Sequence, residues 1–134
     1  NKGIAYVSNY GIENGAIAVS IGHDSHNVIA IGDNDSDMAI AVNTLGKSGG
    51  AAVVSGGEVK EYLELEIAGL MTNRPAEEVI TIHDNLIKAA RALNVTEDVD
   101  PLLSLAFLPL PVIPHIRITD SGLFDVDSFG FIQE

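Results

Sequence analysis

The stretch "AAVVSGGEVKEYLEL" at residues 51–65 decides the fold class, because it predicts a β-hairpin. Gly56 and Gly57 stand between two runs of strand-forming residues, and glycine adopts without strain the positive φ angles of a two-residue hairpin turn. In the second arm the side chains alternate, so that Val59, Glu61, Leu63 and Leu65 share one face and Lys60, Tyr62 and Glu64 the other, and only the first face is strongly apolar. This arm predicts a sheet with one covered face.

Strands are also predicted on both sides of this hairpin. Residues 3–10, 16–21 and 27–32 are rich in Ile, Val, Ala and Tyr, and Asn14-Gly15 is a turn signal between the first two stretches. Near the C-terminus, residues 120–122 are typical of the turn of a last hairpin. Because hairpins outnumber strand-helix-strand units, we expect a mainly antiparallel sheet.

Two segments change to helical spacing, at about residues 35–47 and 75–93. Asn34 precedes the first as a candidate N-cap with Asp37 three residues on, and Gly49-Gly50 is expected to end it. The second begins at Pro75 and carries an apolar stripe for the core, namely Val79, Ile82, Leu86, Ala90 and Leu93. The predicted fold class is therefore α+β, with an antiparallel sheet built from hairpins and both helices packed on it.

Length and composition indicate one folded domain over residues 1–134. The chain is 46% hydrophobic, which favours a folded protein over a disordered one. Its net charge of -12 would repel a phosphate backbone, so we expect no nucleic acid as a partner. The absence of cysteine is consistent with a cytoplasmic protein.

The longest apolar stretch, "PLLSLAFLPLPVIP" at residues 101–114, is not expected to enter a membrane. It is shorter than the roughly 18 residues that a spanning helix needs, and it contains four prolines. We expect most of residues 102–113 in the core and some of them at an interface. The chain begins at Asn1 without a methionine, so we also expect it to be a piece of a longer protein.

One polar cluster lies between two apolar runs and is the candidate site: His23, Asp24, Ser25, His26 and Asn27. Two readings stand side by side, a functional contact and a turn in which Asp24, Ser25 and Asn27 satisfy their own backbone. A metal site is disfavoured because no third ligand group is evident nearby and the two histidines need not converge in a turn. We assign no metal ligand.

The remaining candidates have simpler structural explanations. Residues 33–44 resemble a calcium-binding loop at three positions but lack its central glycine and its closing glutamate, so helix-capping acids explain them better. His83 is expected at the boundary of the core on the second helix. His115 and Arg117 invite a functional hypothesis, but a strand start is the favoured explanation.

A family resemblance extends over nearly the whole chain from residue 3. The segments "GAIAVSIGHDSHNVIAIGDNDSDMAIAVNTL", "GGAAVVSGGEV", "LEIAGLMT" and "LSLAFLPLPVIPHIRITDSGLFDV" occur in this order. Together they resemble the C-terminal domain of bacterial adenine deaminases of the amidohydrolase superfamily. The resemblance implies a parent hydrolase that converts adenine to hypoxanthine and ammonia in purine salvage.

The resemblance also implies what lies outside this chain. A (β/α)8 barrel holding manganese or iron would precede Asn1 and would be the catalytic partner of this domain, with adenine as the substrate of the parent. No catalytic residue is assigned here, and the chain alone is expected to be inactive. The loop of residues 22–27 would cover the mouth of the barrel, which excludes water and positions the purine. The alternatives are an autonomous small-ligand or protein-binding module and an oligomerisation domain that forms a homo-oligomer.

Overall fold

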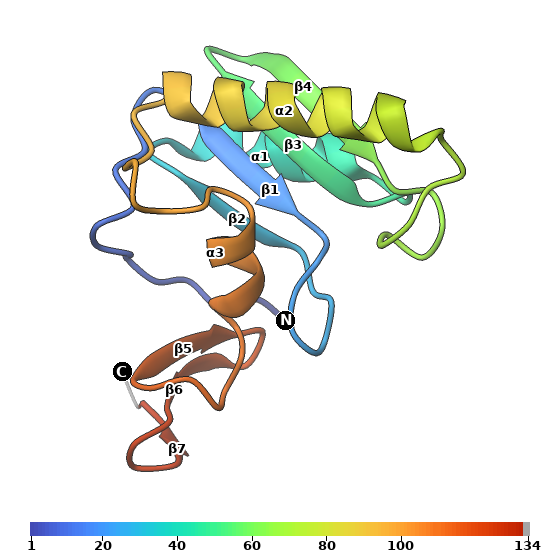
Figure 1. Ribbon diagram of the computed structural model, residues 1–134. Helices are drawn as coiled ribbons and strands as arrows, with labels where there is room; N and C mark the ends of the chain where they lie inside the picture. Colours follow the sequence, from blue (N-terminus) through green and yellow to red (C-terminus); the bar gives the residue numbers. More distant parts are fainter. Residues whose placement is uncertain (133–134) are drawn as a thin grey trace.

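The computed structural model describes residues 1–132 and contains a four-stranded antiparallel sheet in the order β2-β1-β3-β4 (Figure 1). Its strands are β1 (Ala16–Val19), β2 (Ile29–Gly32), β3 (Gly50–Ser55) and β4 (Glu58–Glu64). The β3-β4 hairpin turns at Gly56 and Gly57, whose φ angles of 60° and 80° are positive. The hairpin and the antiparallel sheet predicted from the sequence are confirmed.

Two helices cover opposite faces of this sheet, with α2 (Ala76–Ala92) in front of it and α1 (Asp35–Leu45) behind it in Figure 1. The prediction of a single covered face is wrong. That prediction extended to the whole sheet the pattern of β4, which lies at an edge and exposes its first residues. The inner strands β1 and β3 have apolar side chains on both faces, and both strands are buried almost throughout.

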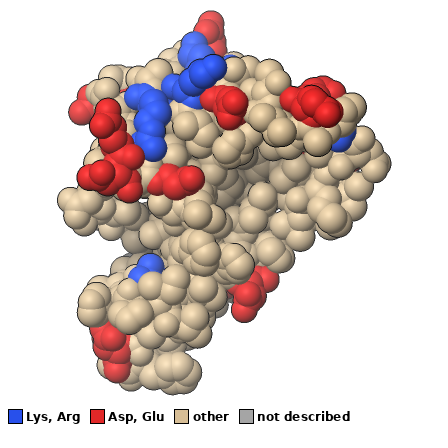
Figure 2. Space-filling view, viewed as in Figure 1, with Lys and Arg blue, Asp and Glu red and all other residues tan. Residues whose placement is uncertain are grey.

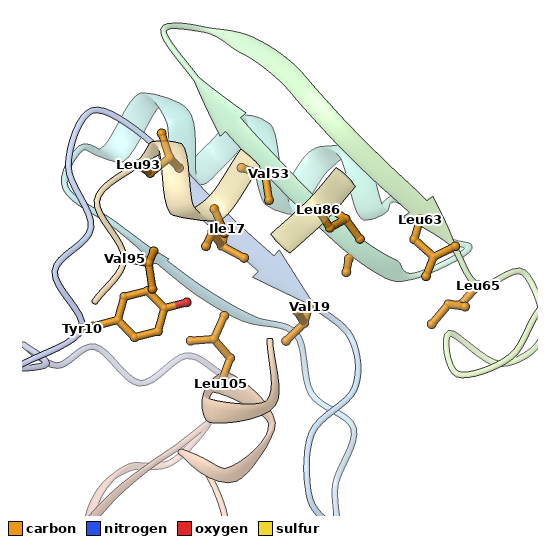
Figure 3. Close-up of a cluster of buried hydrophobic side chains, with 12 residues drawn as sticks. Tyr10, Ile17, Val19, Val53, Leu63, Leu65, Leu86, Leu93, Val95 and Leu105 are labelled. Atoms are coloured by element: carbon orange, nitrogen blue, oxygen red, sulfur yellow. The ribbon is translucent and has the colours of Figure 1, made fainter. Parts of the chain in front are cut away.

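The two faces are packed with side chains of different size. Ile17 and Val19 of β1 point toward α2, where they join Leu86 and Leu105 in the larger part of the core (Figure 3). Ala16 and Ala18 point the other way and pack against Ala41 of α1. Because alanine is small, α1 approaches the sheet closely on that side, and extra volume there would be expected to cost stability.

Side-chain hydrogen bonds fix the start of α1. Asn34 is the N-cap, as predicted, and its Oδ1 accepts the Asp37 backbone N–H at 2.8 Å. The helix ends at Leu45, where Gly46 has a φ of 51°, rather than at the predicted Gly49-Gly50 pair. The second predicted helix agrees with α2 to within one residue at each end.

The C-terminal part contains a short helix and a second sheet. The helix α3 (Leu103–Phe107) was not predicted, because five residues between prolines give little periodicity. The sheet consists of β5 (Ile116–Thr119), β6 (Gly122–Asp125) and β7 (Gly130–Phe131), and its β5-β6 pair is the predicted last hairpin. Within residues 102–113, Leu105 is buried, whereas Leu103 and Val112 are exposed, so this stretch is only partly core.

Two further predictions are wrong. Residues 3–10 do not form a strand, because within the described chain this extended segment pairs with no other strand. His83 is exposed on α2 and does not lie at the core boundary, because the buried side of the helix is centred on Leu86 and Ala90. None of the helices within residues 1–132 is long and apolar enough to cross a membrane.

Candidate functional site

The polar cluster forms the loop between β1 and β2 and is anchored through its backbone. The His23 N–H donates to the carbonyl oxygen of Ala106 in α3 at 2.9 Å, and the His26 N–H donates to that of Gly22 at 2.9 Å. His26 has a positive φ of 52°, which is uncommon outside glycine and tightens this turn. The loop is thus held in shape without using its side chains.

The ring of His23 lies on the ring of Phe107. The two ring centroids are 4.8 Å apart and the planes differ by 13°, which is a stacked arrangement. The His23 side chain remains 47% exposed. Helix α3 therefore contacts His23 twice, through the Ala106 carbonyl and through Phe107, and limits the orientations that the imidazole can adopt.

The other polar side chains of the loop have free hydrogen-bonding groups. Asp24, Ser25, His26 and Asn27 are exposed, and within residues 1–132 their side chains make no hydrogen bond. The nearest polar contact joins Asp24 Oδ1 to His23 Nδ1 at 3.7 Å, which is too long for a hydrogen bond. These side chains do not bond to the loop backbone, and the turn is closed instead by the backbone hydrogen bond from His26 to Gly22.

A surface groove of about 750 Å³ runs beside this loop. His23, Asp24, Ser25 and Asn27 line one wall, whereas His26 is not among its lining residues. The other walls come from sequence-distant parts of the chain: Asn1, Lys2, Gly3, Pro109, Pro111, Ile118, Thr119 and Asp120. The groove thus offers hydrogen-bond donors and acceptors beside the apolar surface of two proline rings and an isoleucine side chain. Its volume lies in the usual range of small-molecule sites.

The acidic residues near α1 have a structural role. The Asp37 carboxylate accepts the backbone N–H groups of Gly56 and Gly57 at 3.1 and 2.7 Å, so it fastens the β3-β4 turn to α1. Asp33 likewise accepts the N–H groups of Asn14 and Gly15. These hydrogen bonds stabilise the ionised carboxylates and hold the pKa of Asp33 and of Asp37 below its ordinary value.

The charged groups near the C-terminus also contact their own backbone or each other. Arg117 donates from Nε to the Ile113 carbonyl at 2.6 Å and from Nη2 to the Pro114 carbonyl. His115 contacts the Asp127 carboxylate and precedes β5 directly, as the strand-start prediction has it. Nowhere in residues 1–132 do three His, Asp or Glu side chains gather around one point as a metal ion requires. These residues therefore do not fit a metal centre.

Comparison with known proteins decides the family. Residues 1–130 match the family described as the adenine deaminase C-terminal domain. The chain belongs to this family. It is 51% identical to the adenine deaminase of Ligilactobacillus salivarius, 49% to that of Clostridium acetobutylicum and 50% to adenine deaminase 1 of Rhizobium meliloti, over 97–99% of its own length. The resemblance stated from the sequence is confirmed.

The chain spans 23% of the length of each of these relatives. The larger part of each full-length relative therefore has no counterpart in the 134 residues of this adenine deaminase C-terminal domain. The similarity includes the candidate loop and both sheets.

Sequence reasoning found the loop of the domain but missed its surroundings. Phe107 lies 84 positions from His23, in a helix that was not predicted, and Lys2 and Asp120 come from opposite ends of the chain. No local pattern connects such distant residues. Only the apolar character of residues 102–113, which we expected in part at an interface, pointed to this region.

Proposed function

We propose that this chain is the C-terminal domain of an adenine deaminase and that its loop of residues 22–27 covers the active site of the preceding catalytic part. In the parent reaction adenine is hydrolysed to hypoxanthine and ammonia, and purine salvage in the cytoplasm is the proposed setting. The manganese or iron that we expect for this reaction would be held by the preceding barrel. We assign no catalytic residue to this domain, and we expect the domain alone to be inactive.

The free side chains of the loop carry this proposal. The side chains of Asp24, Ser25, His26 and Asn27 are exposed and form no hydrogen bond with residues 1–132. The backbone that carries them is nevertheless fixed by hydrogen bonds. A purine presents ring nitrogens and an amino group that such side chains can bind. A cover that brings them over the substrate also excludes water, which strengthens every polar contact beneath it.

The stacked pair explains why His23 is the first residue to test. Its imidazole is fixed on one face by Phe107 and through its backbone by Ala106, so little orientational freedom is lost when it meets a ligand. It also lines the groove, which His26 does not. We therefore expect His23 to contribute more than His26.

The test is steady-state kinetics of the full-length enzyme. Replacing His23→Ala should lower kcat/KM by about tenfold or more, the effect of losing one hydrogen bond to the bound purine. His26→Ala should have a smaller effect. His83→Ala is the matched control, because His83 is an exposed histidine on α2, away from the groove.

The control should leave kcat/KM unchanged. If His23→Ala and His26→Ala both retain the kcat/KM of the parent, the loop does not act on the substrate and the proposed cover is wrong.

The groove favours a second candidate, an autonomous module that binds a small ligand. A groove of about 750 Å³ is formed by the described residues alone and could hold a small ligand without another domain. Calorimetry of the 134-residue chain with adenine separates the two candidates. Binding of adenine to the chain alone would favour the autonomous module, whereas no binding would exclude adenine as the ligand of such a module.

A further inference from the structure

We propose that residues 4–7 form an edge strand that pairs with the polypeptide preceding this domain in the full-length enzyme. The N-terminal strap, defined here as residues 1–9, belongs to neither sheet and is the dark blue segment at the start of the chain in Figure 1. The inference rests on the proposed function in one respect only, namely that a folded catalytic part precedes the strap.

The side chains of the strap alternate as in a strand with one covered face. Gly3 and Ala5 are half-buried against the domain, whereas Ile4 is 74% exposed and Tyr6 is fully exposed. The alternation ends at Val7, which is 42% exposed although it follows Tyr6 directly. Apolar side chains that point outward at alternate positions of an extended segment are typical of a strand whose second face is to be covered.

The backbone of the strap has the open edge that strand pairing requires. Among the residues that the structure describes, residues 1–9 donate and accept no backbone hydrogen bond. Unpaired N–H and C=O groups in an extended segment are a template for another strand, and peptide recognition commonly uses them in this way. The strap therefore offers main-chain pairing together with apolar side chains.

Contacts near both ends keep this edge in place. Gly3 lies so close to the Thr119 carbonyl that a Cβ atom built on it would come within 2.1 Å of the oxygen, so only glycine fits. At the other end, Tyr10 is buried, its hydroxyl donates to the Pro101 carbonyl at 2.6 Å, and its backbone carbonyl accepts the Thr96 N–H at 2.9 Å. Because the strap is fixed at both ends, part of the ordering cost of pairing is already met.

The preceding polypeptide is the occupant that fits best. The family is a C-terminal domain, and this chain spans only 23% of its curated relatives, so the strap would join directly to the larger part of the enzyme. A covalent connection gives that part a high effective concentration at the strap. Residues 3–10 contain no charged side chain in a chain of net charge -12, which favours burial of the strap over solvation. Figure 2 shows many charged side chains gathered over α2 instead.

Hydrogen exchange of the full-length enzyme measures the pairing directly. We expect the amides of residues 4–7 to exchange at least about tenfold more slowly than the same sequence would when unstructured. The protection should be independent of protein concentration. Exchange at nearly the unstructured rate would overturn the inference, and protection that disappears on dilution would indicate a second copy of the chain as the occupant instead.

A matched pair of substitutions tests the apolar side of the contact. Ile4→Ser should lower the unfolding midpoint of the full-length enzyme by several degrees, whereas Ile80→Ser should leave it unchanged, because Ile80 is equally apolar and 60% exposed on α2. Equal midpoints for the two variants would overturn the inference. Kinetics of His23→Ala are independent of both measurements. Slow exchange of the strap together with an unchanged kcat/KM of His23→Ala would support the paired strand and exclude the cover. Fast exchange together with a lowered kcat/KM would support the cover and exclude the paired strand.

Discussion

The central strands β1 and β3 are buried on both faces, whereas the loop of residues 23–27 and the N-terminal strap are exposed along almost their whole length. In the sheet, apolar side chains meet two helices and no buried side-chain polar atom of the described residues lacks a hydrogen bond. Within residues 1–132, the side chains of Asp24, Ser25, His26 and Asn27 in the loop make no hydrogen bond, and Ile4 and Tyr6 of the strap are exposed. The residues that stabilise the domain are therefore different from those proposed to contact the rest of the enzyme, so substitutions can test the two groups separately.

The largest expected effect is on the sheet side of the comparison. Leu86 of α2 is fully buried, with 0% exposure, among the side chains of β1, β3 and α3 (Figure 3). Leu86→Ala should lower the free energy of unfolding by about 2–5 kcal/mol, through lost burial and the cavity left behind. Urea denaturation of the 134-residue chain measures it.

Ile80→Ala on the exposed side of the same helix is the control, and it should change the free energy of unfolding by less than about 0.5 kcal/mol. Similar losses for the two variants would contradict the separation between a packed face and an exposed face.

A smaller effect, dependent on pH, is expected where the helix meets the hairpin. Asp37→Asn replaces a carboxylate that accepts two backbone N–H groups, so one of them would face an amide group that cannot accept. The pKa of Asp37 is lowered in the folded chain, so its contribution to stability is present at neutral pH and is lost as the pH falls through that lowered pKa. The stability difference between parent and variant should therefore shrink in acid.

Thermal unfolding at pH 7 and at pH values below about 4 gives this difference. Asp35→Asn is the control, because Asp35 lies in the same first turn but is exposed and forms no side-chain hydrogen bond with the described residues. A gap that stays constant between the two conditions would exclude the ionised Asp37 as its cause.

The smallest expected effect is on the other side of the comparison. Asn27→Ala and Ser25→Ala should change the free energy of unfolding of the 134-residue chain by less than about 0.5 kcal/mol, because neither side chain has a partner within residues 1–132. The same urea experiment checks this expectation. A loss of 1 kcal/mol or more, roughly that of a made hydrogen bond, would mean that the loop stabilises the domain after all.

How much the sequence predicts depends on how local the cause is. The turn at Gly56-Gly57, the cap at Asn34 and the apolar stripe around Leu86 depend on neighbours within a few residues, and these features were predicted correctly. The strand predicted over residues 3–10 failed for a specific reason. Its composition and alternation are those of a strand, but a strand also needs a pairing partner, and the described chain provides none.

In the candidate site, too, the local features could be predicted from the sequence and the tertiary contacts could not. The cluster of His23, Asp24, Ser25, His26 and Asn27 could be recognised because polar residues interrupt two apolar runs. Its orientation could not, because the stacking of His23 on Phe107 depends on a five-residue helix 84 positions away, and helices this short are held by tertiary packing rather than by intrinsic propensity.

The class of fold, the hairpins, the two long helices and the family could be predicted from the sequence, because they depend on periodicity, turn chemistry and family likeness along the chain. Only the tertiary structure shows that both faces of the sheet are covered, that His26 lies outside the groove and that the strap pairs with no strand of residues 1–132. Burial and strand pairing depend on segments that are distant in the sequence and meet only on folding. The residues next to a position along the chain therefore do not show which surface will cover it.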